Sequence, residues 1–212
     1  MQEAQGGAWF RVIAHERNRG PAAARNSGWN ASTQEFVAFL DADDSWHPEK
    51  LAIQYRFMQE HPEFQLTGHL HVVGGTFVPR QTGVTFVEVR ARQLLTRNRF
   101  VTPSVMVRRT LSARFRDGQR HMEDHLLWMQ LALDGQRVAR IELALASLYK
   151  PQFGAAGQSG DLFAMEAAEL GNYRLLYDAG KIGGLQCVLL MLWSGAKFLR
   201  RLLLVSVGAR RA

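Results

Sequence analysis

Three aspartates fall within four positions at the end of the apolar run 35–40, in the stretch FLDADDSW. Asp41, Asp43 and Asp44 would repel one another in so small a space, and each carboxylate needs water or a cationic partner. Helix capping by Asp44 or Ser45 would account for one of the acids, or two. A hard divalent cation commonly neutralises such a group, and Mg²⁺ takes one or two carboxylates together with phosphate oxygens. The spacing leaves two interpretations open, an acidic helix start and a metal–phosphate site.

A second acidic pair, Glu123 and Asp124, lies within the stretch HMEDHLLWMQLALDGQ. Acidic residues in the first turn of a helix are stabilised by the helix dipole, so the pair alone indicates only a helix start. His121 and His125 flank the pair four residues apart, which raises the question of a zinc site. However, HMEDH matches neither the His-Glu-x-x-His motif nor its inverted form, and a helix would turn Glu123 away from the two imidazoles. We therefore do not expect a zinc hydrolase.

The elements that must position these acids follow from the hydrophobic pattern. Residues 10–16 and 35–40 are apolar runs typical of strands, while 21–32 and 48–62 begin with proline and are typical of helices. Alternating strands and helices indicate an α/β domain with a parallel sheet at its centre. Ligands of such sheets bind beyond the carboxyl ends of the strands, and Asp41 directly follows the second strand.

The rest of the first 150 residues continues this mixture of helices and strands. Residues 64–89 are rich in Val, Thr, Phe and Gly, which predicts strands joined by turns. We further expect a short helix over 90–98, two strands separated by Pro103 over 100–109, a helix over 121–136 that ends at Gly135, and a strand over 137–150.

Two blocks of the sequence are similar to one known family. NRGPAAARNSGWNAS (18–32) and EFVAFLDADDSWHPEKLAIQ (35–54) resemble the nucleotide-sugar transferases of glycosyltransferase family 2, in which an Asn-x-Gly loop and an Ala-Arg-Asn helix precede a strand that ends in Asp-x-Asp. These two stretches form the first block, which runs almost unbroken from Asn18 to Gln54. The second block is MEDHLLWMQLA (122–132). The resemblance implies a GT-A domain, a Rossmann-like α/β domain with a mixed sheet that binds a nucleotide-diphospho-sugar.

The resemblance also implies a divalent cation and a set of substrate contacts. Asp43 would ligate Mg²⁺ or Mn²⁺ that bridges the donor diphosphate, and Asp41 would contact the nucleotide ribose or the metal with its water shell. The metal would stabilise the charge that develops on the departing nucleoside diphosphate. Arg25 would face the nucleotide or a phosphate, unless it is a solvated surface arginine. The residues carried over as substrate-binding are Asn18, Gly20, Arg25, Asn26, Asp41, Glu123 and Trp128.

The same resemblance gives Asp124 the role of general base. Asp124 would take the proton of the acceptor hydroxyl as that oxygen attacks the anomeric carbon from the face opposite the leaving group, so that one displacement inverts the configuration. Trp128 would pack against the core or against a sugar. Processive members carry a Gln-x-x-Arg-Trp motif that this sequence lacks. We therefore expect transfer of single sugars to a glycan or lipid-linked acceptor, in cell-surface polysaccharide or glycolipid synthesis.

Members of the family normally begin with a strand, a helix and a second strand that ends in a DDGS-like turn, and these elements form the pocket for the nucleotide base. This chain starts just before FRVIAHE (10–16), so we expect an incomplete GT-A domain. Such a domain would keep the metal and acceptor residues but would bind its donor weakly. It would also leave a sheet edge and apolar surface uncovered.

Charge and composition narrow the choice of partners. Six of the net seven positive charges fall after residue 178, where there is no acidic residue. A nucleic-acid enzyme more often spreads its basic residues over the main domain, so we expect no nucleic-acid partner. The single cysteine, Cys187, fits a reducing compartment, and MQEAQGGAWFRVIAHE has no signal-peptide pattern. Together these features favour a cytoplasmic location.

The C-terminal segment is both apolar and basic. Residues 182–196 are apolar at all but two positions, but a spanning helix needs about 20 residues and Lys197, Arg200 and Arg201 follow directly. These cations share one helical face, so we expect an amphipathic segment at the cytoplasmic face of a membrane, near anionic lipids, the alternative being a buried helix of the core. The expected organisation is a truncated GT-A domain over 1–150, a helical linker over 151–181 and the membrane-associating segment over 182–212.

Two other functions remain compatible with the motifs. A Mg²⁺-dependent nucleotidyl or phosphoryl transferase could also use Asp41 and Asp43, but it would not need Asp124 as a base for a sugar hydroxyl. A non-catalytic, membrane-associated partner could bind a complete transferase through an exposed sheet edge.

Overall fold

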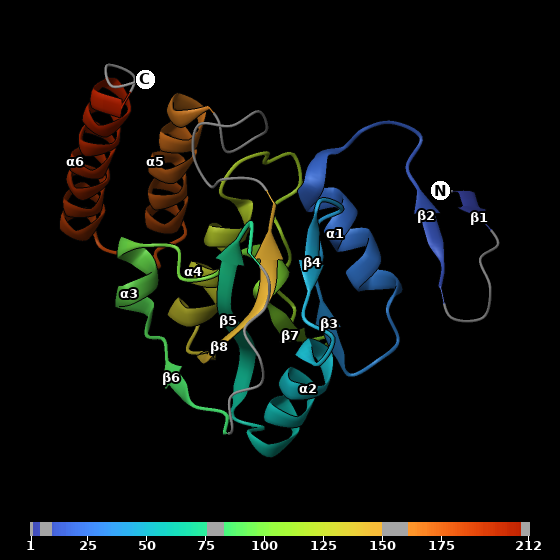
Figure 1. The fold of residues 1–212 in the computed structure, drawn as a ribbon. Coiled ribbons are helices and arrows are strands. Elements are labelled where there is room, and N and C mark those ends of the chain that lie inside the picture. The colour runs from blue at the N-terminus through green and yellow to red at the C-terminus, as the bar shows by residue number, and fades with distance from the viewer. Residues whose placement is uncertain (1, 5–9, 76–82, 150–160, 209–212) are drawn as a thin grey trace.

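The computed structural model describes residues 2–4, 10–75, 83–149 and 161–208, which form a mixed α/β fold (Figure 1). The strands are β1 (Gln2–Ala4), β2 (Val12–Ala14), β3 (Phe36–Ala38), β4 (Asp44–Trp46), β5 (Phe64–Val73), β6 (Phe86–Glu88), β7 (Met106–Arg108) and β8 (Arg137–Leu148). The helices are α1 (Gly20–Ala31), α2 (Lys50–Glu60), α3 (Ala91–Thr96), α4 (Glu123–Leu133), α5 (Leu162–Asp178) and α6 (Gly184–Gly208), with a short 3₁₀ helix, η1 (Thr102–Ser104).

The main sheet has six strands in the order β3–β7–β5–β8–β4, with β6 beside β8. The long strands β5 and β8 are parallel neighbours, whereas the other described pairs in this sheet are antiparallel. The first six residues of β5 and most of β8 are buried or half-buried, as is usual for parallel strands covered on both faces. The predicted α/β class with a mixed sheet is confirmed.

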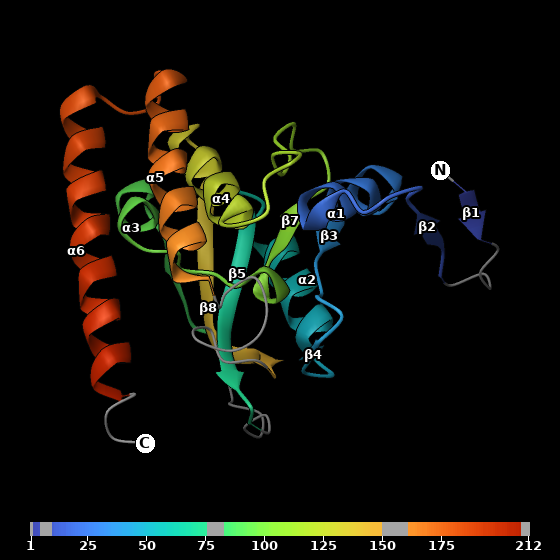
Figure 2. The same ribbon diagram turned by 90° about the horizontal axis from the view of Figure 1, so that it is seen from above.

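The first predicted strand does not join this sheet. Val12–Ala14 pairs with β1 in a separate two-stranded sheet, which lies beside α1 and away from the main sheet (Figures 1 and 2). Val12 is 46% exposed, so this strand has little apolar surface committed to the core. The expected role of 10–16 as a strand of the main sheet is therefore wrong.

Two other local predictions need correction. The region around Pro103 contains one strand rather than two, because residues 102–104 form the 3₁₀ helix in which Ser104 N–H bonds to Val101 O. Helix α2 begins at Lys50 rather than at Pro48. Residues Asp44–Trp46 pair with β8 as strand β4, so Asp41 and Asp43 lie between two strands and Asp44 begins β4 instead of capping a helix.

Helix α4 lies between the sheet and helix α5, and α6 is outermost (Figure 2). Tyr173 of α5 and Cys187 and Leu190 of α6 are buried in the same cluster as Leu127 of α4. Helices α5 and α6 therefore share the core of the sheet rather than forming a detached segment.

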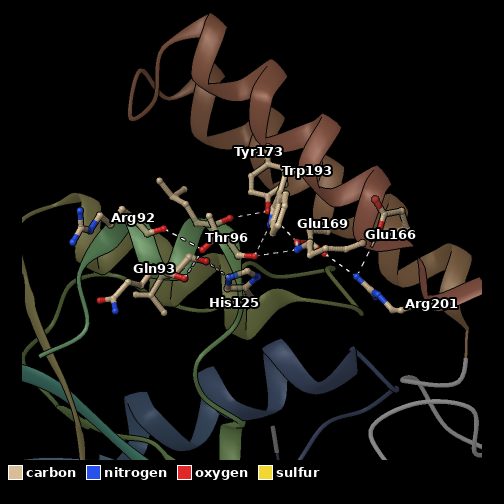
Figure 3. Close-up of polar contacts among 12 residues, drawn as sticks. Arg92, Gln93, Thr96, His125, Glu166, Glu169, Tyr173, Trp193 and Arg201 are labelled. Atoms are coloured by element: carbon tan, nitrogen blue, oxygen red, sulfur yellow. Dashed lines mark hydrogen bonds and ion pairs between the residues drawn. The ribbon is translucent and has the colours of Figure 1, made fainter. Parts of the chain in front are cut away.

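Helix α6 directs two of its cations inward. Lys197 Nζ lies 2.5 Å from a carboxylate oxygen of Glu169 on α5, and Arg201 Nη2 lies 3.6 Å from the other oxygen (Figure 3). Glu169 is only 4% exposed, and a buried carboxylate requires a cationic partner. The expectation that these cations face lipid is therefore wrong for Lys197 and Arg201. None of the helices in the described parts of the chain combines the length and apolar character needed to cross a membrane.

Candidate functional site

Arg25 of α1 joins the two acidic motifs beyond the carboxyl end of β3. Its Nη2 donates to Asp41 Oδ1 at 2.8 Å, and its Nη1 donates to Glu123 Oε1 at 2.7 Å. These partners are 16 and 98 positions away in the sequence, so the fold brings them together. Pro21 in the first turn starts the helix, and fully buried Ala22 fixes its inner face, which leaves Arg25 directed at the acids.

We call Arg25, Asp41, Glu123 and Asp124 the acid site. It holds three carboxylates and one guanidinium. Glu123 is 7% exposed, and its burial, followed by the charge of Asp124, raises its pKa. Burial acts to lower the pKa of Arg25, but the three neighbouring carboxylates outweigh this effect and raise it. The site therefore favours a further positive charge, or a proton on Glu123.

Asp124 stands in the first turn of α4 with both carboxylate oxygens hydrogen-bonded. Oδ2 accepts from Asn98 Nδ2 at 3.1 Å, and Oδ1 accepts from the backbone N–H of His125 at 2.7 Å. Each carboxylate oxygen has further lone-pair capacity, so Asp124 can still accept a proton from a hydroxyl. No sequence motif pointed to Asn98, which precedes Asp124 by 26 positions.

The backbone just before the acidic pair is left-handed. Met122 has φ 56° and ψ 21°, and no other non-glycine residue in the described ranges has positive φ. Asn172 of α5 holds this turn, because its Nδ2 donates to Met122 O at 2.9 Å and its Oδ1 accepts from Gln119 Nε2 at 2.8 Å. Strained backbone that its surroundings over-determine is common at functional sites. The strain here lies directly beside Glu123 and Asp124.

Asp41 and Asp43 are the carboxylates that could hold a cation. A turn connects them, closed by the bond from Asp44 N–H to Asp41 O at 3.1 Å. The Asp41 side chain is 37% exposed and Asp43 is exposed. Within the described ranges, no three His, Cys, Asp or Glu side chains gather as a metal site. Two accessible carboxylates fit Mg²⁺ or Mn²⁺ whose shell is completed by substrate phosphates and water.

A groove of about 660 Å³ borders the acid site along α1 and β3. Arg25 and Asp41 lie on its wall, beside Gly28, Trp29 and Phe39. Pockets that hold small ligands and cofactors have volumes of roughly 300–1,000 Å³. The groove is therefore large enough for a ligand of nucleotide size that contacts both charged residues.

Three further predicted contact residues shape the backbone around α1. Asn18 Oδ1 accepts from Gly20 N–H at 2.8 Å, and Gly20 has a φ of 84°, a conformation that favours glycine. Asn26 is bonded through both of its amide atoms to the backbone of Phe115, at 2.7 and 3.0 Å. These contacts give the three residues a structural role, and their contact with substrate stays a prediction.

Trp128 lies inside the core. Its side chain is 0% exposed, and its ring meets Phe115 edge-on with the centroids 5.7 Å apart. A ring without accessible surface cannot stack on a sugar. Of the two interpretations of Trp128, the structure supports packing in the core, and its assignment as a substrate-binding residue is corrected.

The fold has solved counterparts. The crystal structure of S. aureus TarS 1–349 in complex with UDP-GlcNAc aligns with 88% of this chain and 54% of that chain, with a TM-score of 0.60 and 21% identity. The architecture is therefore the GT-A-like fold of a glycosyltransferase. A model of the family described as Glycosyl transferase family 2 matches residues 2–118, which is more than half of the chain. This chain belongs to that family.

Curated relatives match over parts of their length. WfgD of Escherichia coli, named UDP-Glc:alpha-D-GlcNAc-diphosphoundecaprenol beta-1,3-glucosyltransferase, is 28% identical over 130 residues, covering 59% of this chain and 49% of that protein. The putative teichuronic acid biosynthesis glycosyltransferase TuaG of Bacillus subtilis is 42% identical over 59 residues, or 27% of this chain and 23% of that protein. An uncharacterized glycosyltransferase of Rickettsia conorii is 31% identical over 122 residues, or 56% of this chain and 20% of that protein. The chain thus spans half or less of the length of these relatives.

Proposed function

We propose that this chain is an inverting glycosyltransferase that moves one sugar from a nucleotide-sugar donor to a hydroxyl of a glycan or lipid-linked acceptor, in polysaccharide or glycolipid synthesis. The observation that carries the proposal is the Arg25 bridge, because it unites the Asp41 motif and the Glu123–Asp124 pair beside one groove. The names of two relatives support the acceptor class, since one names a diphosphoundecaprenol-linked sugar and the other teichuronic acid biosynthesis.

Each residue of the acid site has a chemical role in this reaction. Asp124 accepts the proton of the acceptor hydroxyl and so makes its oxygen a better nucleophile. Arg25 borders the groove and can bind a phosphate oxygen of the donor, while Glu123 keeps the guanidinium oriented. When bound by Asp41 and Asp43, Mg²⁺ or Mn²⁺ supplies positive charge that stabilises the leaving nucleoside diphosphate.

Replacement of the base tests the reaction class. Asp124→Asn keeps the size of the side chain but cannot hold the proton, so kcat should fall by about 10²–10⁴ while the donor KM changes little. The measurement is release of nucleoside diphosphate from a panel of nucleotide-sugars with an acceptor and Mg²⁺ or Mn²⁺. Asp178→Asn is the matched control, because the Asp178 side chain is 52% exposed and forms an i,i+4 ion pair with Arg174 on the same helix.

The products distinguish the alternatives. Wild-type transfer by Asp124→Asn would contradict the proposed base and would favour the nucleotidyl or phosphoryl transferase. The anomeric configuration of the product, read by proton NMR, should be opposite to that of the donor. A retained configuration would contradict single displacement.

Removal of the metal tests the role of the aspartates. A chelator should abolish turnover and Mn²⁺ should restore it, because the donor diphosphate needs its charge neutralised. Asp43→Asn should require a higher Mn²⁺ concentration for half-maximal rate than the wild type. Full activity in the chelator would exclude this role for Asp41 and Asp43.

We also propose that the chain acts peripherally at the cytoplasmic face of a membrane, through the outer face of α6. Large apolar side chains on that face are spaced three, four or seven residues apart, and each is more than half exposed: Leu185, Val188, Leu189, Leu192, Leu199 and Leu203. Arg200 is exposed on the same helix. A helix of this kind binds a lipid interface through its buried apolar area and its attraction to anionic lipids.

Vesicle binding tests the membrane proposal. The double variant Leu192→Asp with Leu199→Asp should bind vesicles of phosphatidylcholine and phosphatidylglycerol about tenfold or more weakly in a sedimentation assay, because two charges enter the apolar face. Tyr55→Asp on α2, at a side chain that is 53% exposed, is the control and should bind as the wild type does. Equal binding by the double variant would contradict the proposal.

A further inference from the structure

The last three carbonyl groups of α3 accept hydrogen bonds from side chains of three other helices (Figure 3). Leu94 O accepts from His125 Nε2 of α4 at 2.6 Å, and Leu95 O accepts from the Tyr173 hydroxyl of α5 at 2.8 Å. The third, Thr96 O, accepts from a lysine of α6 at 3.1 Å. Carbonyls at the end of a helix have no partner within it, so these bonds fix the end of α3 against the other helices.

The lysine of α6 is Lys197, which also bonds to Glu169 of α5 at 2.5 Å. The Tyr173 hydroxyl oxygen also lies 2.9 Å from a carboxylate oxygen of Glu169, so its single proton is shared between Leu95 O and Glu169. Burial alone would raise the pKa of Glu169, but the hydrogen bond and charge of Lys197 outweigh it and hold the pKa below its usual value. Glu169 is therefore a buried anion that orients two of the side chains bonded to α3. The residues Thr96, His125, Glu169, Tyr173, Lys197 and Arg201 form what we call the helix-end cluster.

Asn98 follows the end of α3 by two residues and connects it to the acid site. Its Oδ1 accepts from Phe100 N–H at 3.2 Å, which closes a turn, and its Nδ2 donates to Asp124 Oδ2 at 3.1 Å. Phe100 is 3% exposed and packs against Gly68, where an added Cβ would lie 2.1 Å from the ring. The turn is thus held on one side by the helix-end cluster and on the other by the Phe100 ring.

We propose that Asn98 is a positioning residue for Asp124, and that α5 and α6 hold it in place through the end of α3. The proposal rests on the proposed function of Asp124 as general base. The backbone N–H of His125 fixes one carboxylate oxygen, and Asn98 fixes the other, so the carboxylate cannot rotate away from the acceptor hydroxyl. A misplacement of about 1 Å at such a group can cost about 10²-fold in rate.

Two substitutions at Asn98 separate positioning from turn formation. Asn98→Ala removes both hydrogen bonds, whereas Asn98→Asp keeps an acceptor for Phe100 N–H but replaces the donor with a carboxylate that repels Asp124. In both variants kcat should fall about tenfold or more, while the donor KM and the melting temperature stay near wild type. Asn30→Asp is the matched control, since Asn30 is exposed and accepts from Arg114 Nε.

A turn-forming role would give a different pattern, because an aspartate at this position could close the turn as well as asparagine does. Wild-type kcat in Asn98→Asp, or in Asn98→Ala, overturns the proposal. Asn98→Ala should add no further loss in the Asp124→Asn background if Asn98 acts through Asp124, and an equal further loss overturns it.

The failure of this proposal can be told apart from that of the proposed function. If Asp124→Asn transfers sugar at the wild-type rate, the proposed function fails and the positioning role fails with it. If Asp124→Asn loses transfer while both Asn98 variants keep it, the positioning role alone fails.

Discussion

The acid site and the helix-end cluster use the same kinds of side chain but differ in charge balance. In the acid site, Arg25 is shared by Asp41 and Glu123, and Asp124 adds a third carboxylate. In the helix-end cluster, Glu169 is contacted by two cations at 2.5 and 3.6 Å, and the second of them, Arg201, also lies 3.9 Å from Glu166. Helix α4 joins the two networks, because it contributes Asp124 to the acid site and the next residue, His125, to the helix-end cluster. The acid site has one cation for three carboxylates, whereas the helix-end cluster together with Glu166 has two cations for two carboxylates.

The two networks also differ in how far their carboxylates are exposed to solvent. The Asp41 side chain is 37% exposed, whereas that of Glu169 is 4% exposed. A buried ion pair must be satisfied from within the protein, while an accessible carboxylate can be satisfied by a ligand. The difference indicates that the helix-end cluster stabilises the fold, whereas Asp41 in the acid site stays accessible to a ligand.

The largest expected effect on stability follows from breaking the helix-end cluster. Lys197→Met leaves buried Glu169 without its nearest cation and should lower the free energy of unfolding by about 3 kcal/mol, the lower end for a broken buried pair because Arg201 remains nearby. Urea unfolding followed by circular dichroism measures the change. Arg174→Met, which removes an exposed i,i+4 pair with Asp178, is the control and should cost less than about 0.5 kcal/mol. Equal losses of unfolding free energy in the two variants would contradict a stabilising role of the helix-end cluster.

The corresponding change in the acid site should cost less stability. Arg25→Met removes the cation shared by two carboxylates, but Glu123, whose pKa is already raised, can take up a proton. We expect a loss of about 1–2 kcal/mol, together with a higher donor KM because a phosphate contact is lost. Arg19→Met, which breaks an exposed pair with Asp117, should change neither quantity measurably. A stability loss as large as that of Lys197→Met would remove the distinction between the two networks.

The smallest expected effect is on how stability depends on pH, with opposite signs for Glu123 and Glu169. The pKa of Glu123 is raised in the folded chain, so above the ordinary value of 4.5 its contribution to stability is lost as the pH rises through the folded pKa. The pKa of Glu169 is lowered, so its contribution is present above 4.5 and is lost as the pH falls through the folded pKa.

Unfolding in urea across about pH 3.5–7 checks these signs. Relative to the wild type, Glu123→Gln should gain stability as the pH rises, and Glu169→Gln should lose it. Parallel changes in the two variants would contradict the assigned pKa directions.

Several elements could be predicted from the sequence because their signals are local. The apolar run before Asp41 forms β3, and α4 begins at Glu123 and is followed by Gly135, which has a φ of 79°. Hydrophobic period, acidic first-turn residues and a glycine in the left-handed region all act within a few residues of one another. The family could also be recognised, because its motifs lie in continuous blocks such as 18–32 and 35–54.

The sequence by itself determined that a strand precedes Asp41, that a helix contains Glu123 and Asp124, and which family the chain joins. Only the tertiary structure decided that Arg25 binds a glutamate 98 positions away, that Lys197 turns toward Glu169 rather than toward a membrane, and that Trp128 is buried. A hydrophobic pattern shows that one face of an element will be covered, but it does not show what will cover it. Partners of charged side chains depend on how distant segments meet, and that is set by the pairing of β5 with β8 and the packing of α4 against α5.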